Sequence, residues 1–414
     1  MLHSLISVAV GTLVALPAQA AGTAVRGRAD VSPPGVAATP PMGWNGYPHF
    51  GPGMSAAQIE AGAHALVTSG MAAAGYRYVV VDGGWASLHR DAAGSLVPSP
   101  ARYPAGIQPV IDYVHSLGLT FGLYTSAGMA NCAATSAGSY GHEKRDAAQF
   151  AAWGIDFLKL DWCYVPYSDF PGWTSEQVAQ RLAWRMSSAL GATGRPVVLD
   201  VNDAVGSRLH DFDWQWAPVL ASEWRIASDI RPTYAEMVAR IFGIGLPWPR
   251  PYDLRLWSYA GPNSWNDPDI LEVGNAGMST TLSRTEFSLW AEEAAPLMAG
   301  NDLTTMTAAT RAILTNAGVI AVDQDPLGRQ GHPVSARSGH WVIAKPLAGR
   351  SVAVVLFNAT HSAATITTTA SAVGLPSAAR YRLRNLWSRT TRRSTGKISA
   401  EVPSHRLVML RASV

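Results

Sequence analysis

The sequence has little net charge, few cysteines and no long apolar run beyond its first residues, and each shortage excludes a class of protein. The formal net charge of +3 is too small to indicate a nucleic-acid partner or an acidic membrane surface. After residue 20, no apolar run reaches the roughly 18 residues that a transmembrane helix requires. Glycine-rich phosphate-binding fingerprints are absent, and no group of His, Cys and Asp residues has metal-ligand spacing. We therefore expect no metal, no cofactor, and neither a nucleic-acid nor a membrane partner.

The composition is that of a folded chain with a sizeable core. Hydrophobic residues make up 48% of the 414 residues and charged residues 15%, which argues against general disorder. The length suffices for one large barrel and a small second domain. Fifteen tryptophans are present; Trp-rich clefts suit sugar faces, although most Trp residues belong to cores.

Residues 1–20 have the pattern of an export signal. An apolar run from Leu5 to Leu16 precedes the small-x-small sequence at residues 18–20 (AQA), although the residues before the run include His3 and no Lys or Arg. Residues 21–38 are rich in Gly, Ala and Pro and are interpreted as a flexible leader. We therefore expect a secreted, extracellular protein.

Cys132 and Cys163 are the two cysteines of the chain. An even count in an oxidising compartment indicates a disulfide. Such a bond would close a loop of about 30 residues and stabilise the fold by roughly 3–4 kcal/mol in the chain-entropy model. Two buried thiols are the alternative.

From residue 39 to residue 328, short apolar runs alternate with segments of helical periodicity. Strands are expected at 76–81, 119–124, 155–161 and 196–199, and helices at 104–116, 142–153, 174–190, 285–295 and 307–317. Repeated βα units of this length indicate an α/β fold with a parallel sheet, and their number favours a (β/α)8 TIM barrel.

The pattern changes near Gly328. Residues 329–414 are rich in Val, Ile, Thr and Ser in short alternating runs, of which 352–357 is the clearest strand. Without helical periodicity, this segment is predicted to be a small C-terminal antiparallel β-sandwich domain. Its arginine run could bind anions, but a solvated strand face is the simpler interpretation; the run comprises Arg380, Arg382, Arg384, Arg389, Arg392 and Arg393.

Residues 154–163 (GIDFLKLDWC) are typical of a buried parallel strand with polar groups at its end. Lys159 and Asp161 are two residues apart, so their side chains share one face of the strand. Burying an ammonium and a carboxylate is costly unless they have partners or a function. In an α/β barrel, this end of the strand carries catalytic groups; a strand-end salt bridge is the alternative.

Other predicted strand ends also carry polar groups, at Asn45, Asp82, Tyr124, and Arg225 with Asp229. Carboxylates gathered at barrel strand ends suit acid/base or nucleophilic chemistry on glycosides. A glycosidase needs two carboxyl groups beside one bond, one ionised and one protonated. Spacing alone does not choose that pair among the 29 acidic residues.

Long ordered motifs of the chain resemble glycoside hydrolase family 27, the family of α-galactosidases and α-N-acetylgalactosaminidases. The resemblance covers about residues 39–331, and the domain change near Gly328 also fits it. The motifs are residues 39–45 (TPPMGWN), 158–163 (LKLDWC), 224–225 (WR) with 229–230 (DI), 265–271 (WNDPDIL) and 319–325 (VIAVDQD).

This resemblance implies two catalytic carboxyls roughly 5–5.5 Å apart. Asp161 would be the nucleophile that forms a glycosyl-enzyme ester, and Asp229 the general acid and then the base that activates water. Each step inverts the anomeric carbon, so the sum is retention. Cys132 and Cys163 match the family's disulfide.

The resemblance also assigns contacts with an oligo- or polysaccharide substrate. Lys159 and Arg225 would bind sugar hydroxyls and keep the nucleophile ionised. Trp44 would offer a face to the sugar, Asp82 would accept its hydroxyl hydrogens, and Tyr124 would contact the nucleophile. Asp267 matches a pocket-lining position. The alternatives are a core Trp44, a structural ion pair for Lys159, an Arg225 that only orients Asp229, and a turn Asp267 before Pro268.

The chain departs from the family at its specificity positions. The α-galactosidases carry two adjacent Asp followed by Cys-Trp at the end of the second strand, where this chain has residues 82–85 (DGGW). Gly83 lacks the carboxylate that grips the outer hydroxyls of galactose, a loss of about 1.5–3 kcal/mol, and Gly84 removes a family disulfide. The family's Cys-Glu-Trp motif is also absent, and Asn202 or Asp203 would take its place.

We therefore expect a retaining glycoside hydrolase of α-galactosidase type. The altered specificity positions leave two variants of the family open, the β-L-arabinopyranosidase type and the isomalto-dextranase type. A carbohydrate-binding barrel without catalysis is a further alternative, which the presence of both Asp161 and Asp229 disfavours. The sequence does not give the oligomeric state.

Overall fold

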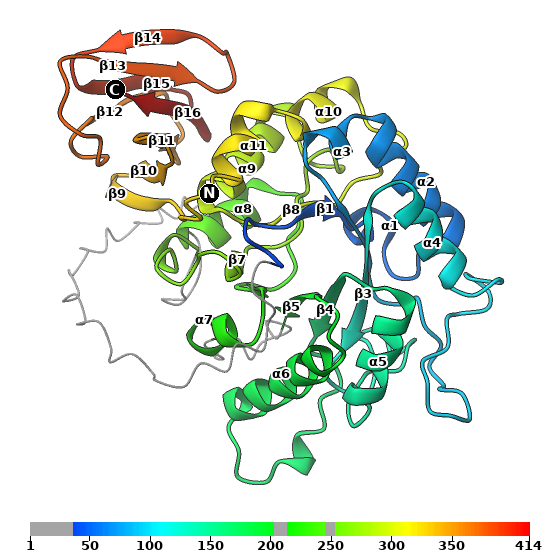
Figure 1. The fold of residues 1–414 in the computed structure, drawn as a ribbon. Helices are drawn as coiled ribbons and strands as arrows, with labels where there is room; N and C mark the ends of the chain where they lie inside the picture. The colour runs from blue at the N-terminus through cyan, green and yellow to red at the C-terminus, as the bar shows by residue number, and fades with distance from the viewer. Residues whose placement is uncertain (1–35, 203–212, 245–252) are drawn as a thin grey trace, which may run out of the picture.

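The protein is a barrel joined to a second, all-β domain (Figure 1). The computed structural model describes residues 36–202, 213–244 and 253–414. The predicted signal segment and most of the predicted leader lie outside the described residues. Of the described helices, none combines the length and the apolar character needed to cross a membrane.

Eight parallel strands of the described chain form the barrel sheet, in the order β7-β6-β5-β4-β3-β2-β1-β8. Leu271, just after β7, closes the barrel through a parallel bridge to Ala299 of β8. The predicted TIM barrel is therefore confirmed. Its strands are β1 (Met42–Trp44), β2 (Tyr78–Val81), β3 (Thr120–Ser126), β4 (Phe157–Asp161), β5 (Val198–Asn202), β6 (Glu223–Arg225), β7 (Trp265–Asp267) and β8 (Leu297–Ala299).

Helices surround the sheet (Figure 1). They are α1 (Tyr47–Phe50), α2 (Ala56–Thr68), α3 (Met71–Ala74), α4 (Gln108–Ser116), α5 (Glu143–Trp153), α6 (Ser175–Ala192), α7 (Asp213–Trp216), α8 (Tyr234–Phe242), α9 (Thr280–Glu293), α10 (Ala308–Leu314) and α11 (Ala317–Asp323).

Local sequence signals fix the ends of the helices that flank β4. Helix α5 ends at Gly154, whose φ of 83° is a left-handed conformation that glycine adopts without a Cβ penalty. Helix α6 begins with a capping box. The Thr174 hydroxyl accepts from the backbone N–H of Gln177, and the Gln177 side chain accepts from the backbone N–H of Thr174. Both helix ends next to β4 therefore have capped backbone groups.

In β4 and β5, alternate side chains face opposite sides of the sheet, and the polar ones face the barrel interior. Leu158 and Leu160 belong to the hydrophobic core that contains the helices, so Lys159 and Asp161 face the barrel interior. The predicted strand at 196–199 is too short, since β5 runs on through Asp200 to Asn202. These polar residues are inward-facing members of the strand, because the neighbouring strands cover both of its edges.

The C-terminal domain consists of antiparallel strands. A six-stranded sheet has the order β14-β13-β16-β11-β10-β9, and β12 pairs with β15 in a second sheet; this confirms the predicted β domain. The strands are β9 (His332–Arg337), β10 (His340–Leu347), β11 (Ser351–Asn358), β12 (Ala364–Thr369), β13 (Tyr381–Asn385), β14 (Thr391–Ser394), β15 (Lys397–Val402) and β16 (Arg406–Ser413).

A buried lysine ties the two domains together. Lys345 of β10 is 1% exposed, and its Nζ donates to the carbonyl oxygen of Ala291 in α9 at 2.7 Å. Burial lowers the pKa of Lys345, while the nearby carboxyls of Asp323 and Glu292 oppose that effect. Burial in turn raises the pKa of Glu292 to about 8. Each charged group in this interface therefore depends on the others.

Replacing Lys345 by Met should destabilise the protein by roughly 3–5 kcal/mol, because the acidic partners remain buried without their cation. The matched control is Lys397→Met on exposed β15, which should change stability by less than about 0.5 kcal/mol. Denaturant unfolding of both variants makes the measurement. Equal stability of the two variants would show that the buried lysine contributes nothing to the interface.

Candidate active site

The carboxyl ends of the barrel strands bring the predicted site residues together. In the parallel register, Tyr124, Lys159 and Asp200 are direct neighbours on β3, β4 and β5. Asp161 lies beside Asn202, and Arg225 of β6 lies beside Asp267 of β7. Because parallel strands in a barrel end at the same face, side chains from these five strands meet at one mouth.

Asp161 is held by two hydrogen bonds at the end of β4. The hydroxyl of Tyr124 donates to its Oδ2 at 2.7 Å, and the backbone N–H of Trp162 donates to its Oδ1 at 3.0 Å. Its side chain is 6% exposed. Both carboxylate oxygens are therefore fixed in orientation, as a nucleophile requires.

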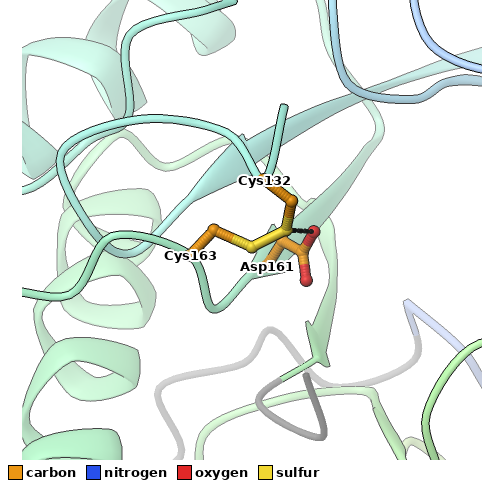
Figure 2. Close-up of side chains that lie close together, drawn as sticks. All are labelled: Cys132, Asp161 and Cys163. Atoms are coloured by element: carbon orange, nitrogen blue, oxygen red, sulfur yellow. Dashed lines mark hydrogen bonds between the residues drawn. A yellow bond between two sulfur atoms is a disulfide. The ribbon is translucent and has the colours of Figure 1, made fainter. Parts of the chain in front are cut away.

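A disulfide joins Cys132 to Cys163, with their Cα atoms 5.0 Å apart. Figure 2 shows it directly beside Asp161, and Cys132 Sγ is 3.3 Å from Asp161 Oδ2. The bond ties the loop after β3 to the loop after β4. It therefore places a rigid, non-ionisable wall against the carboxylate.

Lys159 and Asp82 form a buried ion pair in the floor of the site. Lys159 Nζ is 2.8 Å from Asp82 Oδ2, and the same oxygen accepts from Asn45 Nδ2 at 2.8 Å. The other oxygen accepts from the backbone N–H of Gly83 at 2.7 Å. Asp82 thus orients the lysine and still has lone pairs free for a ligand hydroxyl.

Arg225 connects three carboxyl groups on the opposite side of the mouth. Its Nη2 is 2.7 Å from Asp269 Oδ2 and 3.4 Å from Asp229 Oδ1, and its Nε is 3.9 Å from Asp267 Oδ2. Arg225 itself is 3% exposed, whereas the Asp229 side chain is 72% exposed. Asp229 is therefore both oriented by a buried cation and open to a ligand.

The two candidate catalytic carboxyls have pKa values shifted in opposite directions. Burial raises the pKa of Asp161 above its ordinary value, against the opposing effects of Lys159 and the Tyr124 hydrogen bond. Burial also raises the pKa of Asp229, but the charges of Arg225 and Lys159 outweigh this effect and hold that pKa below its ordinary value. Lys159 thus acts on both carboxyls.

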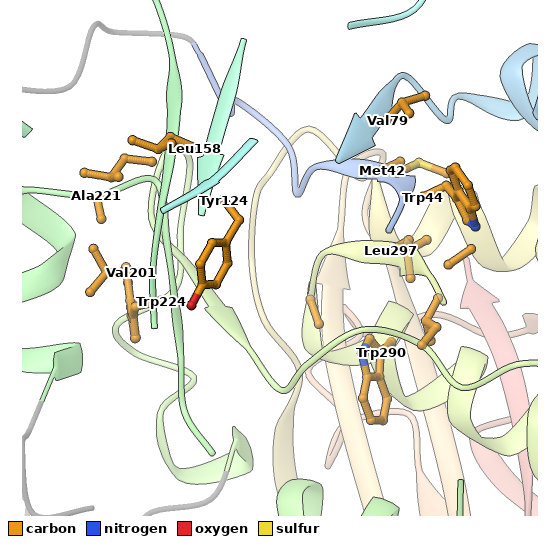
Figure 3. Close-up of a cluster of buried hydrophobic side chains, with 14 of the residues drawn as sticks. Met42, Trp44, Val79, Tyr124, Leu158, Val201, Ala221, Trp224, Trp290 and Leu297 are labelled. Carbon is orange, nitrogen blue, oxygen red and sulfur yellow. The ribbon is translucent and has the colours of Figure 1, made fainter. Parts of the chain in front are cut away.

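The structure corrects the prediction for Trp44. Gly43 faces the barrel interior, where a Cβ would collide with Tyr78 and Met298, so Trp44 points outward. Its indole is 1% exposed, donates to the carbonyl oxygen of Asn301 and lies in the hydrophobic cluster of Figure 3. Trp44 is a core residue and offers no face to a sugar.

Two residues of the site were missed from the sequence. Tyr47 is the first residue of α1, which follows β1; burial raises its pKa, as do the charges of Asp82, Asp229 and Asp161, so it lies among them. Its ring is 5.9 Å from Lys159 Nζ. Asp269, in the motif from which only Asp267 was chosen, binds Arg225. The position of Tyr47 just past a barrel strand was the available signal.

Asp267, Asp200 and Glu223 form a buried acidic cluster below Arg225. Their carboxylate oxygens lie within 4.8 Å of one another, beside an internal cavity of about 20 Å³. Such a group suits either a cation or shared protons. Lys159 and Arg225 line the same cavity and repel a further cation, while burial and neighbouring carboxyls raise the pKa values of Asp200 and Glu223 well above normal. We interpret Asp200 and Glu223 as protonated carboxyls beside Asp267, whose pKa burial raises to about 6.

The remaining residues predicted to contact the substrate are Asn202, Asp203 and Asp267. Asn202 is 2% exposed, and among the described residues its Oδ1 has no hydrogen-bond donor. Asp203, its predicted alternative, lies outside the described residues. Asp267 accepts from the backbone N–H of Asp269 at 2.8 Å, which is the turn role given above as the alternative. The position also lines the internal cavity.

The two glycines after Asp82 differ in what they tolerate. A Cβ at Gly83 would lie 3.4 Å from Asn131 Nδ2 and 3.5 Å from the Tyr124 ring, which are ordinary contacts toward the site. At Gly84, φ is 94° and a Cβ would lie 2.8 Å from the backbone nitrogen of Gly53. The backbone N–H of Gly53 donates to the carbonyl oxygen of Gly83 at 2.9 Å. Close backbone packing therefore joins the two loops here.

Taken together, a TIM barrel with carboxyls, a buried Lys and a buried Arg at its mouth defines the class of barrel glycosidases. The family described as alpha galactosidase A matches residues 39–325. The family described as alpha galactosidase C-terminal beta sandwich domain matches residues 337–412. The chain belongs to glycoside hydrolase family 27 and is a glycosidase of α-galactosidase type.

Curated relatives agree over most of their length. The alpha-galactosidase of Coffea arabica is 40% identical over 379 residues, which cover 90% of this chain and 93% of that protein. The alpha-galactosidase of Cyamopsis tetragonoloba is 39% identical over 379 residues, covering 90% and 85%. The alpha-N-acetylgalactosaminidase of Gallus gallus is 32% identical over 368 residues, covering 86% and 87%.

Solved structures share the fold. Alpha-galactosidase I from Mortierella vinacea superposes with a TM-score of 0.82 at 30% identity and covers 91% of this chain and 98% of its own. A β-L-arabinopyranosidase from Geobacillus stearothermophilus superposes with a TM-score of 0.76, covering 92% of this chain and 97% of its own. Its identity of 20% means that it shows the fold alone.

Replacing Tyr124 by Phe should shift the acid limb of the pH profile of kcat/KM to higher pH. The lost hydrogen bond favours the ionised form of Asp161, so its removal raises the pKa of that carboxyl further. The loss of a hydrogen bond to a charged group, about 1.5–3 kcal/mol, corresponds to roughly a 10- to 150-fold loss of activity. The matched control is Tyr76→Phe, which loses a hydroxyl bonded to Leu314 outside the site and should keep the wild-type profile.

Proposed function

We propose that the chain is a secreted, retaining glycoside hydrolase that removes a terminal sugar from an oligo- or polysaccharide. The observation that carries this is the arrangement around Lys159. One carboxyl, Asp161, is buried and fixed by two hydrogen bonds, the other, Asp229, is exposed and held by Arg225, and the Lys159 charge acts on both. One fixed and one accessible carboxyl are what double displacement needs.

In the first step, an Asp161 oxygen attacks the anomeric carbon as the bond to the leaving oxygen breaks. The carboxylic acid of Asp229 gives its proton to that leaving oxygen, and an ester to Asp161 is formed. In the second step, the Asp229 carboxylate takes a proton from water, whose oxygen attacks the anomeric carbon and releases Asp161. Two inversions retain the configuration.

The pKa shifts given above are those of the site without a sugar in it. A sugar seated against Asp229 would remove water from a side chain that is 72% exposed, and this desolvation raises its pKa toward that of a general acid. Positive charge that develops on the sugar ring would stabilise the ionised form of Asp161. Binding would thus bring Asp229 toward the protonated state of a general acid, and the transition state would favour the ionised form of Asp161.

For the sugar, we propose a terminal α-linked galactose or a close relative of it. The α-galactosidase relatives at 38–40% identity support galactose. The absence of a carboxylate at Gly83 favours a pyranose without the C6 hydroxymethyl group, as in a β-L-arabinopyranoside. Such a sugar has fewer hydroxyl groups on its outer edge that need a hydrogen-bond partner. The isomalto-dextranase type remains a more distant alternative, and a non-catalytic barrel does not account for the fixed orientation of Asp161.

Secretion is proposed on two features. Residues 1–20 have the pattern of an export signal, and the chain's two cysteines form a disulfide, which persists in oxidising compartments. Secreted material that begins after residue 20 would support this part of the proposal, and retention of the full chain in the cell would overturn it.

Asp161→Asn should lower turnover of a nitrophenyl glycoside by at least about 10⁴-fold, because the amide cannot form the ester. Asp229→Asn should keep the first step with a good leaving group and regain turnover when azide replaces water. The matched control is Asp112→Asn on the exposed face of α4, which should behave as wild type. NMR of the first-formed sugar anomer tests retention; the opposite anomer, or an active Asp161→Asn variant, would refute the assignment.

Gly83→Asp should raise the ratio of α-galactoside to β-L-arabinopyranoside kcat/KM by roughly 10- to 150-fold, since one charge-assisted hydrogen bond contributes about 1.5–3 kcal/mol. Gly83→Ala is the matched control, because it adds the same Cβ without the carboxylate and should leave the ratio within about threefold of wild type. An unchanged ratio in a folded Gly83→Asp variant would mean that another residue already holds the outer hydroxyls.

A further inference from the structure

The charges of the chain are divided unevenly between its two domains. Of the 32 basic and 29 acidic residues, residues 329–414 hold 13 and 1, which leaves 19 and 28 for residues 1–328. The C-terminal domain therefore has a formal net charge of +12 and the rest of the chain −9. A net charge of +3 for the whole chain conceals a strongly basic domain. Such a field attracts polyanions and speeds their association.

Basic side chains gather around one groove on this domain. The groove has a volume of about 630 Å³ and is lined by side chains of β14, β15 and the segment before β13. Glu401 is the single acidic residue among them, and hydroxyl groups complete the lining. The lining residues include Arg380, Arg392, Arg393, Lys397, Ser394, Thr395 and Ser399.

The cations of this groove form no ion pairs with the described residues, although Arg392 Nη2 donates to the backbone carbonyl oxygen of Ser399. Arg380, Arg392, Arg393 and Lys397 are exposed. None of them is within 4.0 Å of a carboxylate oxygen in the part of the chain that the structure describes, where the ion pairs lie in the barrel. Their charges are therefore free for a ligand.

The sheet also accepts a like-charge contact at this place. In the β13–β14 register, Arg382 lies directly opposite Arg393, and directly opposed like charges destabilise a sheet. Strand β14 is an edge strand at the outer side of the domain (Figure 1). An anion seated on the arginines would remove this repulsion. The simpler interpretation of a solvated strand face does not account for a repulsive pair next to a groove.

We propose that this basic groove binds an anionic polysaccharide, such as a polyuronate chain, and holds the glycosidase barrel on carbohydrate material. The Thr395 hydroxyl supplies a donor and an acceptor for sugar hydroxyls beside the arginines that receive carboxylates. The hydroxyls of Ser394 and Ser399 are bonded within the domain and offer their remaining lone pairs. Because the barrel is a glycosidase, a charged saccharide is the polyanion that its substrates would adjoin.

Two other polyanions fit the groove less well. Single-stranded nucleic acids bind through aromatic side chains on which bases stack, and the groove lining contains no aromatic residue. Membrane-surface binding combines basic charge with exposed apolar side chains, and Val414 is the one large apolar residue exposed in the C-terminal domain. Both classes serve as outcomes of the experiment that follows.

The test measures binding of the full chain to polygalacturonate and to its fully methyl-esterified form, which has the same backbone without the charges. We expect binding to the charged polymer at least about tenfold tighter, and a steep fall in affinity between 50 and 200 mM salt. The groove variant Arg380→Gln/Arg392→Gln/Arg393→Gln should lose about tenfold or more of that affinity. Its turnover of a small nitrophenyl glycoside should equal that of the wild type.

The matched control removes the same charge from exposed arginines of the domain that do not line the groove, in the triple variant Arg337→Gln/Arg350→Gln/Arg406→Gln. It should bind polygalacturonate within about threefold of the wild type. Equal losses in both variants would overturn the groove as the site, and equal binding of both polymers would overturn an anionic ligand. Tighter binding of DNA or of phosphatidylglycerol vesicles than of polygalacturonate would assign the groove to that polyanion instead. The salt dependence of the unmodified chain keeps the test decisive if a variant fails to fold.

Discussion

Lys159 is an ammonium group inside a barrel, where loss of water would lower its pKa. The carboxylates of Asp82 and Asp161 nonetheless raise the pKa above its ordinary value, so the lysine stays charged. Its charge in turn opposes the effect of burial on Asp161. Removing Lys159 would leave Asp82 buried without its ion-pair partner, at a cost of several kcal/mol. The geometry of the mouth depends on this mutual compensation.

The barrel interior holds more carboxyls than cations, and the surplus shapes the site. Arg225 is shared among Asp229, Asp267 and Asp269, which leaves the deeper Asp200 and Glu223 to bind protons. A hydrogen-bonded floor of this kind holds its dipoles fixed before a substrate arrives, which is how preorganised sites stabilise developing charge. Helix packing supports the floor from outside through the apolar residues that alternate with the polar ones along each strand.

The two domains use charge for different ends. In the barrel, charges are buried, paired and directed at a mouth. On the outer strands of the C-terminal domain they are exposed, basic except for Glu401, and without ion pairs among the described residues. Lys345, which joins the domains, follows the barrel pattern because it is buried against acidic groups of α9 and α11. A docked binding module that leaves the mouth free is consistent with this division.

The sequence by itself determined the alternation of strands and helices, the change of domain near residue 328, and the end of β4 at Asp161. These features follow from hydrophobic periodicity and from polar residues at strand ends, and both signals are contained in short segments of the sequence. It did not decide that Trp44 faces outward or that β5 continues through Asp200, because a side chain's face depends on register in the closed sheet. The places of Tyr47 and Asp269 were likewise decided by tertiary structure alone. They adjoin Lys159 and Arg225 only because barrel closure brings distant loops together.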